Sequence, residues 1–135
     1  MLNNFKLRYF FVFILFGLSL FSGSKAADNY LEPDDAFRLE LSISKPNLIK
    51  MNWTIANGYS LYQERIKVFV AEKNISSTIR FPPSIQKFDV NFNKNVQVYK
   101  KFLQLDLPID SKNLGNGFNI QYQGCSDDGL CYSPI

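Results

Sequence analysis

Residues 37–43 read FRLELSI and residues 49–55 read IKMNWTI, and in both stretches apolar and polar side chains alternate. A period of two predicts a β-strand with one buried face, because successive side chains of a strand point to opposite faces of the sheet. The Asn57-Gly58 dipeptide that follows is a turn signal. The two stretches therefore predict a pair of strands, each with one face against a core.

Alternation, or a comparable content of β-branched residues, marks four further stretches: residues 65–70, 77–81, 96–109 and 118–123. The phase changes at Lys100-Lys101, which predicts a bulge or a break into two strands. No window of helical length carries a 3.6-residue apolar stripe. About seven short strands separated by turns predict an all-β protein, an antiparallel β-sandwich.

Residues 82–95 (PPSIQKFDVNFNKN) are the longest stretch without clear periodicity. We therefore expect a loop here, and loops of this length in compact domains are often functional.

The first 26 residues have the composition of an export signal. Lys6 and Arg8 precede an uncharged apolar run over residues 9–21, and the small residues Ser24 and Ala26 suit a cleavage site. The run is shorter than the roughly 20 residues that cross a bilayer. We expect a signal peptide at 1–26 and one exported domain over 27–135, in an oxidising compartment.

The basic excess of the chain belongs to this signal. The sequence has 15 Lys and Arg against 12 Asp and Glu, but Lys6, Arg8 and Lys25 precede residue 27. Removing these three leaves 12 basic against 12 acidic residues. Because binding to nucleic acid or an anionic membrane needs uncompensated basic clusters, we expect neither partner.

The residue types also limit the chemistry. The chain has no histidine, which excludes Ser-His and Cys-His nucleophile pairs and His-based zinc sites. Asp127-Asp128 lacks the spaced oxygen ligands that Ca²⁺ requires. We expect no metal and no cofactor.

Cys125 and Cys131 are the two cysteines, within GCSDDGLCY at residues 124–132. One interpretation is a structural disulfide in a non-catalytic exported β-sandwich binding module. Closing a loop of about seven residues would stabilise the fold by only about 2–2.5 kcal/mol. The other is a dithiol–disulfide couple, in which a partner thiolate attacks one sulfur and the other leaves. The residues alone leave both open.

The loop itself predicts weakly reactive thiols. Asp127 and Asp128 disfavour a neighbouring thiolate, and the loop contains no Lys, Arg or His to offset them. We therefore expect an ordinary or raised thiol pKa.

Residues 122–134 (YQGCSDDGLCYSP) resemble the active-site segment of the N-terminal periplasmic domain of the thiol:disulfide interchange protein DsbD. NWTI at 52–55, GYSLY at 58–62 and VYK at 98–100 are similar to further segments of that family, in the same order. The resemblance spans roughly residues 30–135.

This resemblance implies an immunoglobulin-like fold and a periplasmic protein-disulfide reductase. The domain would take electrons from a thioredoxin-like domain and pass them to disulfide isomerases and cytochrome c maturation thiol proteins. It would contact the membrane only through a companion membrane domain that is absent from this chain.

The resemblance also implies roles for individual residues. Cys131 would form the mixed disulfide with partners and Cys125 would resolve it. Phe92 would be an aromatic cap over the pair, with Phe88 as the alternative if the alignment shifts. The remaining site residues would be Tyr59 and Tyr62, lining the site, and Asp127 and Asp128 in its loop. The aromatic residues among these would otherwise be packing residues.

The sequence also departs from the family pattern. Ser60 stands where a tyrosine is often found, and Ser133 replaces the first proline of the usual Cys-Tyr-Pro-Pro. The family domain normally continues into another strand, whereas this sequence stops at Ile135. We therefore expect a truncated product, a fragment or a stand-alone version.

Overall fold

The computed structural model describes residues 30–109, 115 and 117–135. The predicted signal peptide lies outside the described residues. Within them, no helix is both long enough and apolar enough to span a bilayer.

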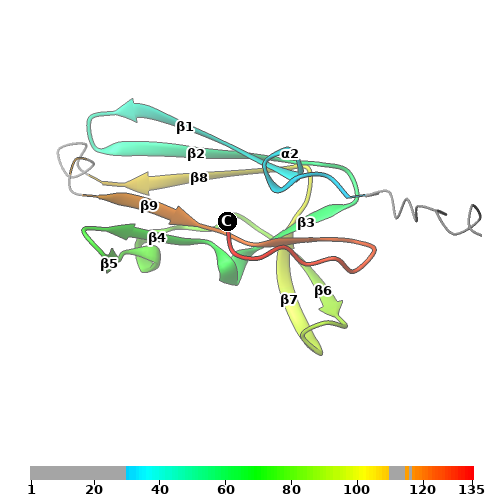
Figure 1. Cartoon of the computed structure of the whole chain (residues 1–135). Helices are drawn as coiled ribbons and strands as arrows, with labels where there is room; N and C mark the ends of the chain where they lie inside the picture. The colour runs from blue at the N-terminus through cyan, green and yellow to red at the C-terminus, as the bar shows by residue number, and fades with distance from the viewer. Residues whose placement is uncertain (1–29, 110–114, 116) are drawn as a thin grey trace, which may run out of the picture.

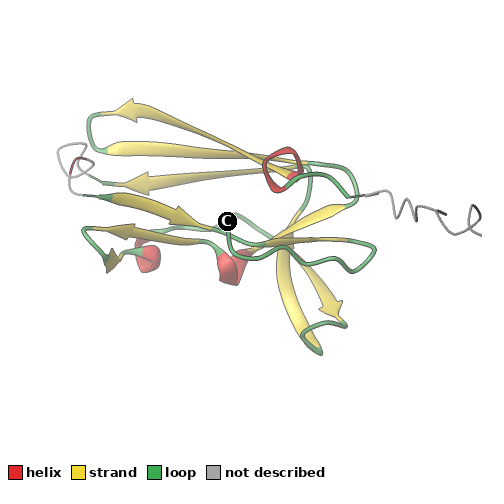
Figure 2. Cartoon of the chain, in the orientation of Figure 1, coloured by secondary structure: helices red, strands yellow, loops and turns green. Residues whose placement is uncertain are grey.

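The described strands form antiparallel sheets arranged in layers (Figures 1 and 2). The first sheet has the order β1 (Phe37–Lys45), β2 (Leu48–Ile55) and β8 (Phe102–Pro108). The facing sheet has the order β5 (Lys73–Asn74), β4 (Lys67–Val70) and β9 (Phe118–Gln121). The third has the order β10 (Gly124–Ser126), β3 (Tyr59–Tyr62), β7 (Lys94–Tyr99) and β6 (Ile85–Asp89). The predicted antiparallel β-sandwich is confirmed.

The part of the chain that the structure describes also contains short helical turns: α2 (Pro33–Ala36) precedes β1, η1 (Gln63–Arg65) lies between β3 and β4, and η2 (Ser76–Thr78) lies between β5 and β6.

The core lies between the layers and is built by the alternation that predicts the strands. Trp53 lies opposite Leu103, and Met51 lies opposite Leu105, in the antiparallel register of β2 and β8. All four side chains are fully buried. Burial of each such side chain stabilises the fold by about 1.5–3 kcal/mol. Tyr122 packs edge-on against Trp53 at 5.6 Å between ring centroids, which ties the segment before the cysteines to the core.

The phase change at Lys100-Lys101 marks the place where the chain passes from one sheet to another. β7 ends at Tyr99 in the sheet that contains Cys125, and β8 begins at Phe102 in the first sheet. Lys101 has a φ of 67°, and its carbonyl accepts a 2.8 Å hydrogen bond from Ile55 N. The predicted break into two strands is confirmed.

The strand predicted at residues 77–81 is wrong. This region begins with the 3₁₀ turn η2, followed by irregular chain. Its polar side chains bond locally: Ser76 N donates to Asn74 Oδ1 at 2.9 Å, and Thr78 Oγ1 donates to Ile75 O at 2.8 Å. Such bonds compete with strand pairing, and the apolar pattern alone does not reveal them.

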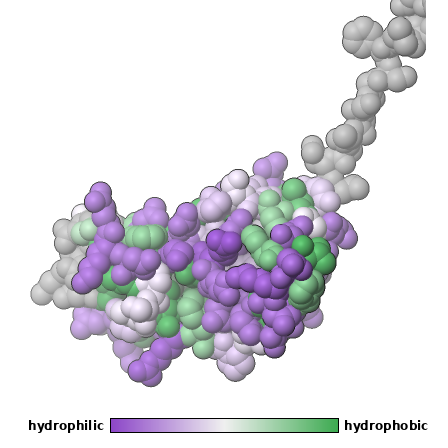
Figure 3. Space-filling model, turned by 90° about the horizontal axis from the view of Figure 1, so that it is seen from below, coloured by the Kyte–Doolittle hydropathy of each residue, from purple (hydrophilic) through white to green (hydrophobic). Residues whose placement is uncertain are grey.

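The loop predicted at residues 82–95 is instead mostly a β-hairpin, made of β6 and β7, that projects from the end of the sandwich (Figure 1). Its apolar alternation is weak because much of β6 faces water: Ile85 and Phe88 are exposed. The surface seen from below in Figure 3 is mostly hydrophilic with separate apolar areas. This projecting hairpin is the element that reaches the cysteine pair.

Candidate active site

Cys125 and Cys131 are joined by a disulfide across a tight hairpin, with their Cα atoms 4.0 Å apart. Cys125 belongs to β10, and Cys131 pairs with it as an isolated antiparallel bridge. The two sulfur-bearing residues differ in access to solvent. Cys125 is 1% exposed, whereas Cys131 is only partly buried. An attacking thiolate therefore reaches Cys131 more readily than Cys125.

The hairpin is held by its own backbone hydrogen bonds. Ser126 N donates to Leu130 O at 2.7 Å on one side of the disulfide, and Tyr132 N donates to Gly124 O at 3.1 Å on the other. Gly129 has a φ of 102°, which suits glycine at the turn. Because these bonds do not involve sulfur, the hairpin has support that remains when the disulfide opens.

Gly124 lets the hairpin approach the core. A Cβ atom at this position would clash with the ring of Phe37 and lie 2.8 Å from Ser60 O. The absence of a side chain therefore allows β10 to pair closely with β3.

The two tyrosines of β3 point in opposite directions. Cys125 lies opposite Ser60, and alternation places Tyr62 on the same face as Ser60. Tyr62 packs in one buried cluster with Cys125. Tyr59 instead belongs to the main core, where its ring lies 5.9 Å from that of Phe37. The structure thus brings Tyr62 to the cysteine pair and places Tyr59 behind β3.

Phe92 lies between β6 and β7 and packs against the cluster that contains Cys125 and Tyr62. Its ring meets Tyr62 edge-on at 5.9 Å between centroids, and the guanidinium carbon of Arg65 lies 5.1 Å from its centroid. Phe88, the alternative cap, is 59% exposed on β6. The structure therefore brings Phe92, and not Phe88, to the pair.

A buried carboxylate organises the loop that carries Phe92. Asp89 is 4% exposed, and its Oδ1 accepts hydrogen bonds from Asn91 N at 2.8 Å and Phe92 N at 3.1 Å. Tyr62 donates its hydroxyl hydrogen bond to Oδ2 of the same side chain. Burial by itself raises the pKa of Asp89, but the hydrogen bonds from Tyr62, Phe92 and Asn91 outweigh it and hold that pKa below its usual value. Burial and the bond to Asp89 raise the pKa of Tyr62.

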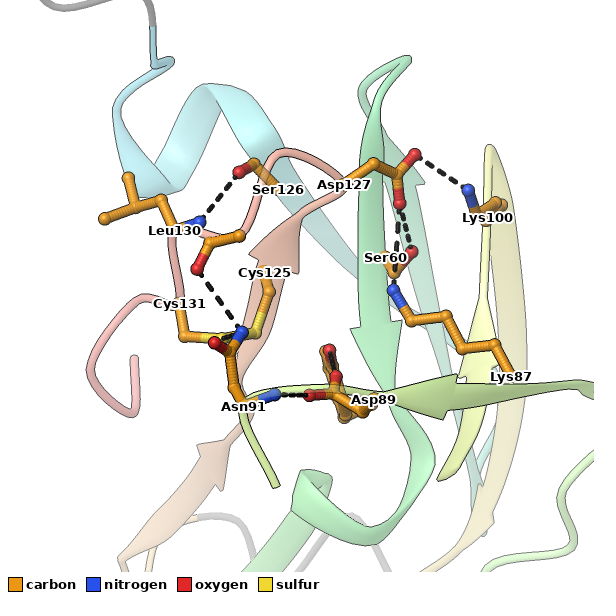
Figure 4. Close-up of polar contacts among 12 residues, drawn as sticks. Ser60, Lys87, Asp89, Asn91, Lys100, Cys125, Ser126, Asp127, Leu130 and Cys131 are labelled. Carbon is orange, nitrogen blue, oxygen red and sulfur yellow. Dashed lines mark hydrogen bonds and ion pairs between the residues drawn. A yellow bond between two sulfur atoms is a disulfide. The ribbon is translucent and has the colours of Figure 1, made fainter. Parts of the chain in front are cut away.

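The charge of Asp127 is balanced from other strands (Figure 4). Lys100 Nζ lies 2.8 Å from its Oδ2, Lys87 Nζ lies 3.8 Å from its Oδ1, and Ser60 Oγ donates to Oδ1 at 3.1 Å. The hydrogen bond from Lys100 contributes most to holding the pKa of Asp127 below its usual value. Asp128 is exposed in the same loop.

The loop itself contains no Lys, Arg or His, as the sequence shows, but the charge of Asp127 is offset by lysines from outside it. Lys87 and Lys100 are distant from the loop in sequence, and the pairing of β10, β3, β7 and β6 brings them to it.

Asn91 is a site residue that the sequence did not identify. Its Nδ2 donates to Gly129 O at 3.3 Å and to Cys131 Sγ at 3.5 Å (Figure 4). Its position next to Phe92 was visible in the sequence, but the direction of its side chain was not.

Fold and site together define an antiparallel β-sandwich domain with a disulfide-forming cysteine pair in a hairpin at one end. Residues 27–135 match the family model described as "Thiol:disulfide interchange protein DsbD, N-terminal". The chain belongs to this family.

Similar proteins agree with this assignment. The chain is 31% identical over 115 residues to the Thiol:disulfide interchange protein DsbD of Ralstonia nicotianae, covering 83% of this chain and 19% of the relative. It is 33% identical over 125 residues to the DsbD of Campylobacter jejuni, covering 89% and 21%. The chain thus spans about a fifth of the length of these relatives.

Two solved structures from Neisseria meningitidis are also similar. The DsbD N-terminal domain in the reduced form has a TM-score of 0.66 at 28% identity, covering 81% of this chain and 86% of that one. A complex between the DsbD N-terminal and the PilB N-terminal domains gives a TM-score of 0.58 at 27% identity, covering 81% and 84%.

Proposed function

We propose that this domain is a periplasmic protein-disulfide reductase that relays electrons through reversible opening of the Cys125–Cys131 disulfide. The observation that carries the proposal is the unequal access to the two bonded cysteines. A buried Cys125 beside a partly exposed Cys131 gives the exchange a direction, because a partner meets Cys131 first.

The proposed exchange has two steps in each direction. A thiolate of the donor attacks Cys131 Sγ, the disulfide breaks, and Cys125 leaves with the electron pair and takes up a proton. The second thiolate of the donor then attacks the donor's first sulfur, which is bonded to Cys131 in the mixed disulfide, and Cys131 leaves with the electron pair and takes up a proton. The donor ends as a disulfide and this domain as a dithiol, after transfer of two electrons and two protons. With an acceptor disulfide, Cys131 attacks and Cys125 resolves.

Phe92 serves in this proposal as the cap over the pair. Its contact with Tyr62 and the Asp89-organised loop support a closed position in the free domain. A cap of this kind keeps small thiols from the disulfide until a protein partner displaces it. Asp127 and Asp128 lie in the hairpin between the two cysteines, and Tyr59 packs from the core against Tyr132 of that hairpin.

The partners follow from the family. We propose a thioredoxin-like domain as electron donor, and disulfide isomerases and cytochrome c maturation thiol proteins as acceptors. The complex of the neisserial DsbD N-terminal domain with a PilB domain supports docking of such domains onto another protein. Export by the signal peptide at residues 1–26 would place the domain in the periplasm, and any link to the membrane would run through a companion domain.

An exchange assay tests this function. The oxidised chain is mixed with the reduced thioredoxin-like domain of a DsbD relative, and free thiols are trapped with a maleimide that shifts gel mobility. We expect electrons to pass to Cys125 and Cys131 and a reduction potential above about −300 mV. A pair that stays oxidised in contact with the donor, with a potential far below this value, would instead support the structural disulfide of a binding module.

A further inference from the structure

Asn91 approaches the cysteine pair from the projecting hairpin, and its side-chain amide faces Cys131. The nitrogen lies 3.3 Å from Gly129 O and 3.5 Å from Cys131 Sγ. A backbone carbonyl oxygen can only accept a hydrogen bond, so the amide must turn its NH₂ group, and not its oxygen, toward these two atoms. The two hydrogens of that group suffice for both acceptors.

The backbone of Asn91 is fixed as well as its side chain. Its N–H donates to Asp89 Oδ1 at 2.8 Å, in the same buried carboxylate that holds Phe92 N. The amide is thus presented from a loop that is anchored independently of the disulfide. Opening the disulfide removes neither of the two hydrogen bonds to Asp89, from Asn91 N and from Phe92 N.

We propose that Asn91 stabilises the thiolate of Cys131 directly, by donating a hydrogen bond to its sulfur. This inference rests on the proposed function, in which Cys131 is the exchanging sulfur. A disulfide sulfur is a weak acceptor, whereas a thiolate is a charged one and forms a stronger hydrogen bond with the same donor. The bond therefore strengthens when Cys131 leaves a mixed disulfide with the electron pair.

The charged groups near Cys131 do not provide an equivalent interaction. Asp127, in the same hairpin, is balanced by Lys87 of β6 and by Lys100. Asp89, at the end of β6, already accepts hydrogen bonds from the Tyr62 hydroxyl and from the loop backbone. Exposed Asp128 disfavours a thiolate. Among the described residues, Asn91 is the side chain that donates to this sulfur.

The test is the pH profile of alkylation of Cys131 by iodoacetamide. It uses the full exported chain with Cys125→Ser, so that one thiol reacts. Asn91→Ala should raise the pKa of Cys131 by about 0.5–1, because a hydrogen bond to the charged form is lost. The rate near pH 7 should fall about two- to threefold, since the smaller thiolate fraction outweighs the gain in nucleophilicity. Asn91→Asp, which is nearly isosteric but adds a negative charge, should raise the pKa further.

Asn95→Ala is the matched control, because it removes an exposed amide from the same hairpin in β7. It should leave the profile unchanged. If Asn91→Ala leaves the midpoint in place and only speeds alkylation at every pH, the residue merely closes the hairpin over the sulfur and the proposal is overturned. A midpoint that moves equally in Asn95→Ala also overturns it. The assay needs no protein partner, so its failure is distinct from failure of electron exchange with the thioredoxin-like domain.

Discussion

Replacing Phe92 by alanine should make the disulfide much more reactive toward small thiols. Two contacts hold the ring near the pair: the edge-on contact with Tyr62 at 5.9 Å and the guanidinium of Arg65 at 5.1 Å. An aromatic pair contributes about 0.5–1.5 kcal/mol and an exposed cation–π contact about 0.5–1 kcal/mol. If reaction requires the ring to leave, their loss lowers the barrier by about 1–2.5 kcal/mol. At about 1.36 kcal/mol per tenfold change, this predicts an acceleration of about 5- to 70-fold.

The assay is the rate of reduction of the oxidised chain by glutathione, stopped with acid and quantified by maleimide gel shift. Phe88→Ala is the control, because it removes a phenylalanine from the same hairpin that is 59% exposed. It should leave the rate unchanged. Equal rates for wild type and Phe92→Ala, or equal acceleration in both variants, would refute the idea that Phe92 shields the pair.

Two further predictions concern stability. Gly124→Ala should lower the free energy of unfolding, measured by urea denaturation, by about 1–3 kcal/mol, because the new methyl group meets the ring of Phe37. The control Gly115→Ala should not lower it, because a Cβ atom there has open space around it. Equal stability of the two variants would contradict the close approach of β10 to β3. Because the pKa values of Asp89 and Asp127 lie below normal in the folded chain, their stabilisation is fully present above the unfolded value of about 3.9 and is lost as pH falls through the folded values. The free energy of unfolding should therefore drop as the pH is lowered below about 4, and Asp89→Asn should make this drop shallower. An identical slope in the variant would show that Asp89 does not contribute to it.

The sequence predicts the sandwich well where a strand has one wet and one dry face. β2 and β8 alternate visibly because one face of each lies on the core. β1 alternates in the sequence as well, but only Phe37 and Leu39 reach the core, and Leu41 and Ile43 are exposed. β3 gives no such signal, since all four of its residues are buried. β6 fails for the opposite reason, because most of it is exposed on a projecting hairpin. Periodicity reports burial, so strands buried or exposed on both faces escape it.

The candidate site divides in a similar way. The cysteine pair and its hairpin are local in sequence, and the motif made them recognisable. The partners of Asp127 are not local: Lys87 and Lys100 reach it only through strand pairing in the folded sheet. The same holds for Asn91, whose amide meets a sulfur 40 positions along the chain. A family likeness indicated that Phe92 belongs near the pair but gave no information on these polar contacts.

Trapping a mixed disulfide tests whether Cys131 is the exchanging sulfur. A thioredoxin-like domain that keeps only its nucleophilic cysteine is first converted to its mixed disulfide with thionitrobenzoate. It is then mixed with the reduced Cys125→Ala or Cys131→Ala variant of this chain, and the release of thionitrobenzoate is followed. We expect Cys125→Ala to form the covalent complex rapidly. Thionitrobenzoate release should be at least about tenfold slower with Cys131→Ala, because its remaining thiol, Cys125, is 1% exposed in the folded domain. Equal rates for the two variants, or faster reaction of Cys131→Ala, would contradict the role of Cys131 as the exchanging sulfur.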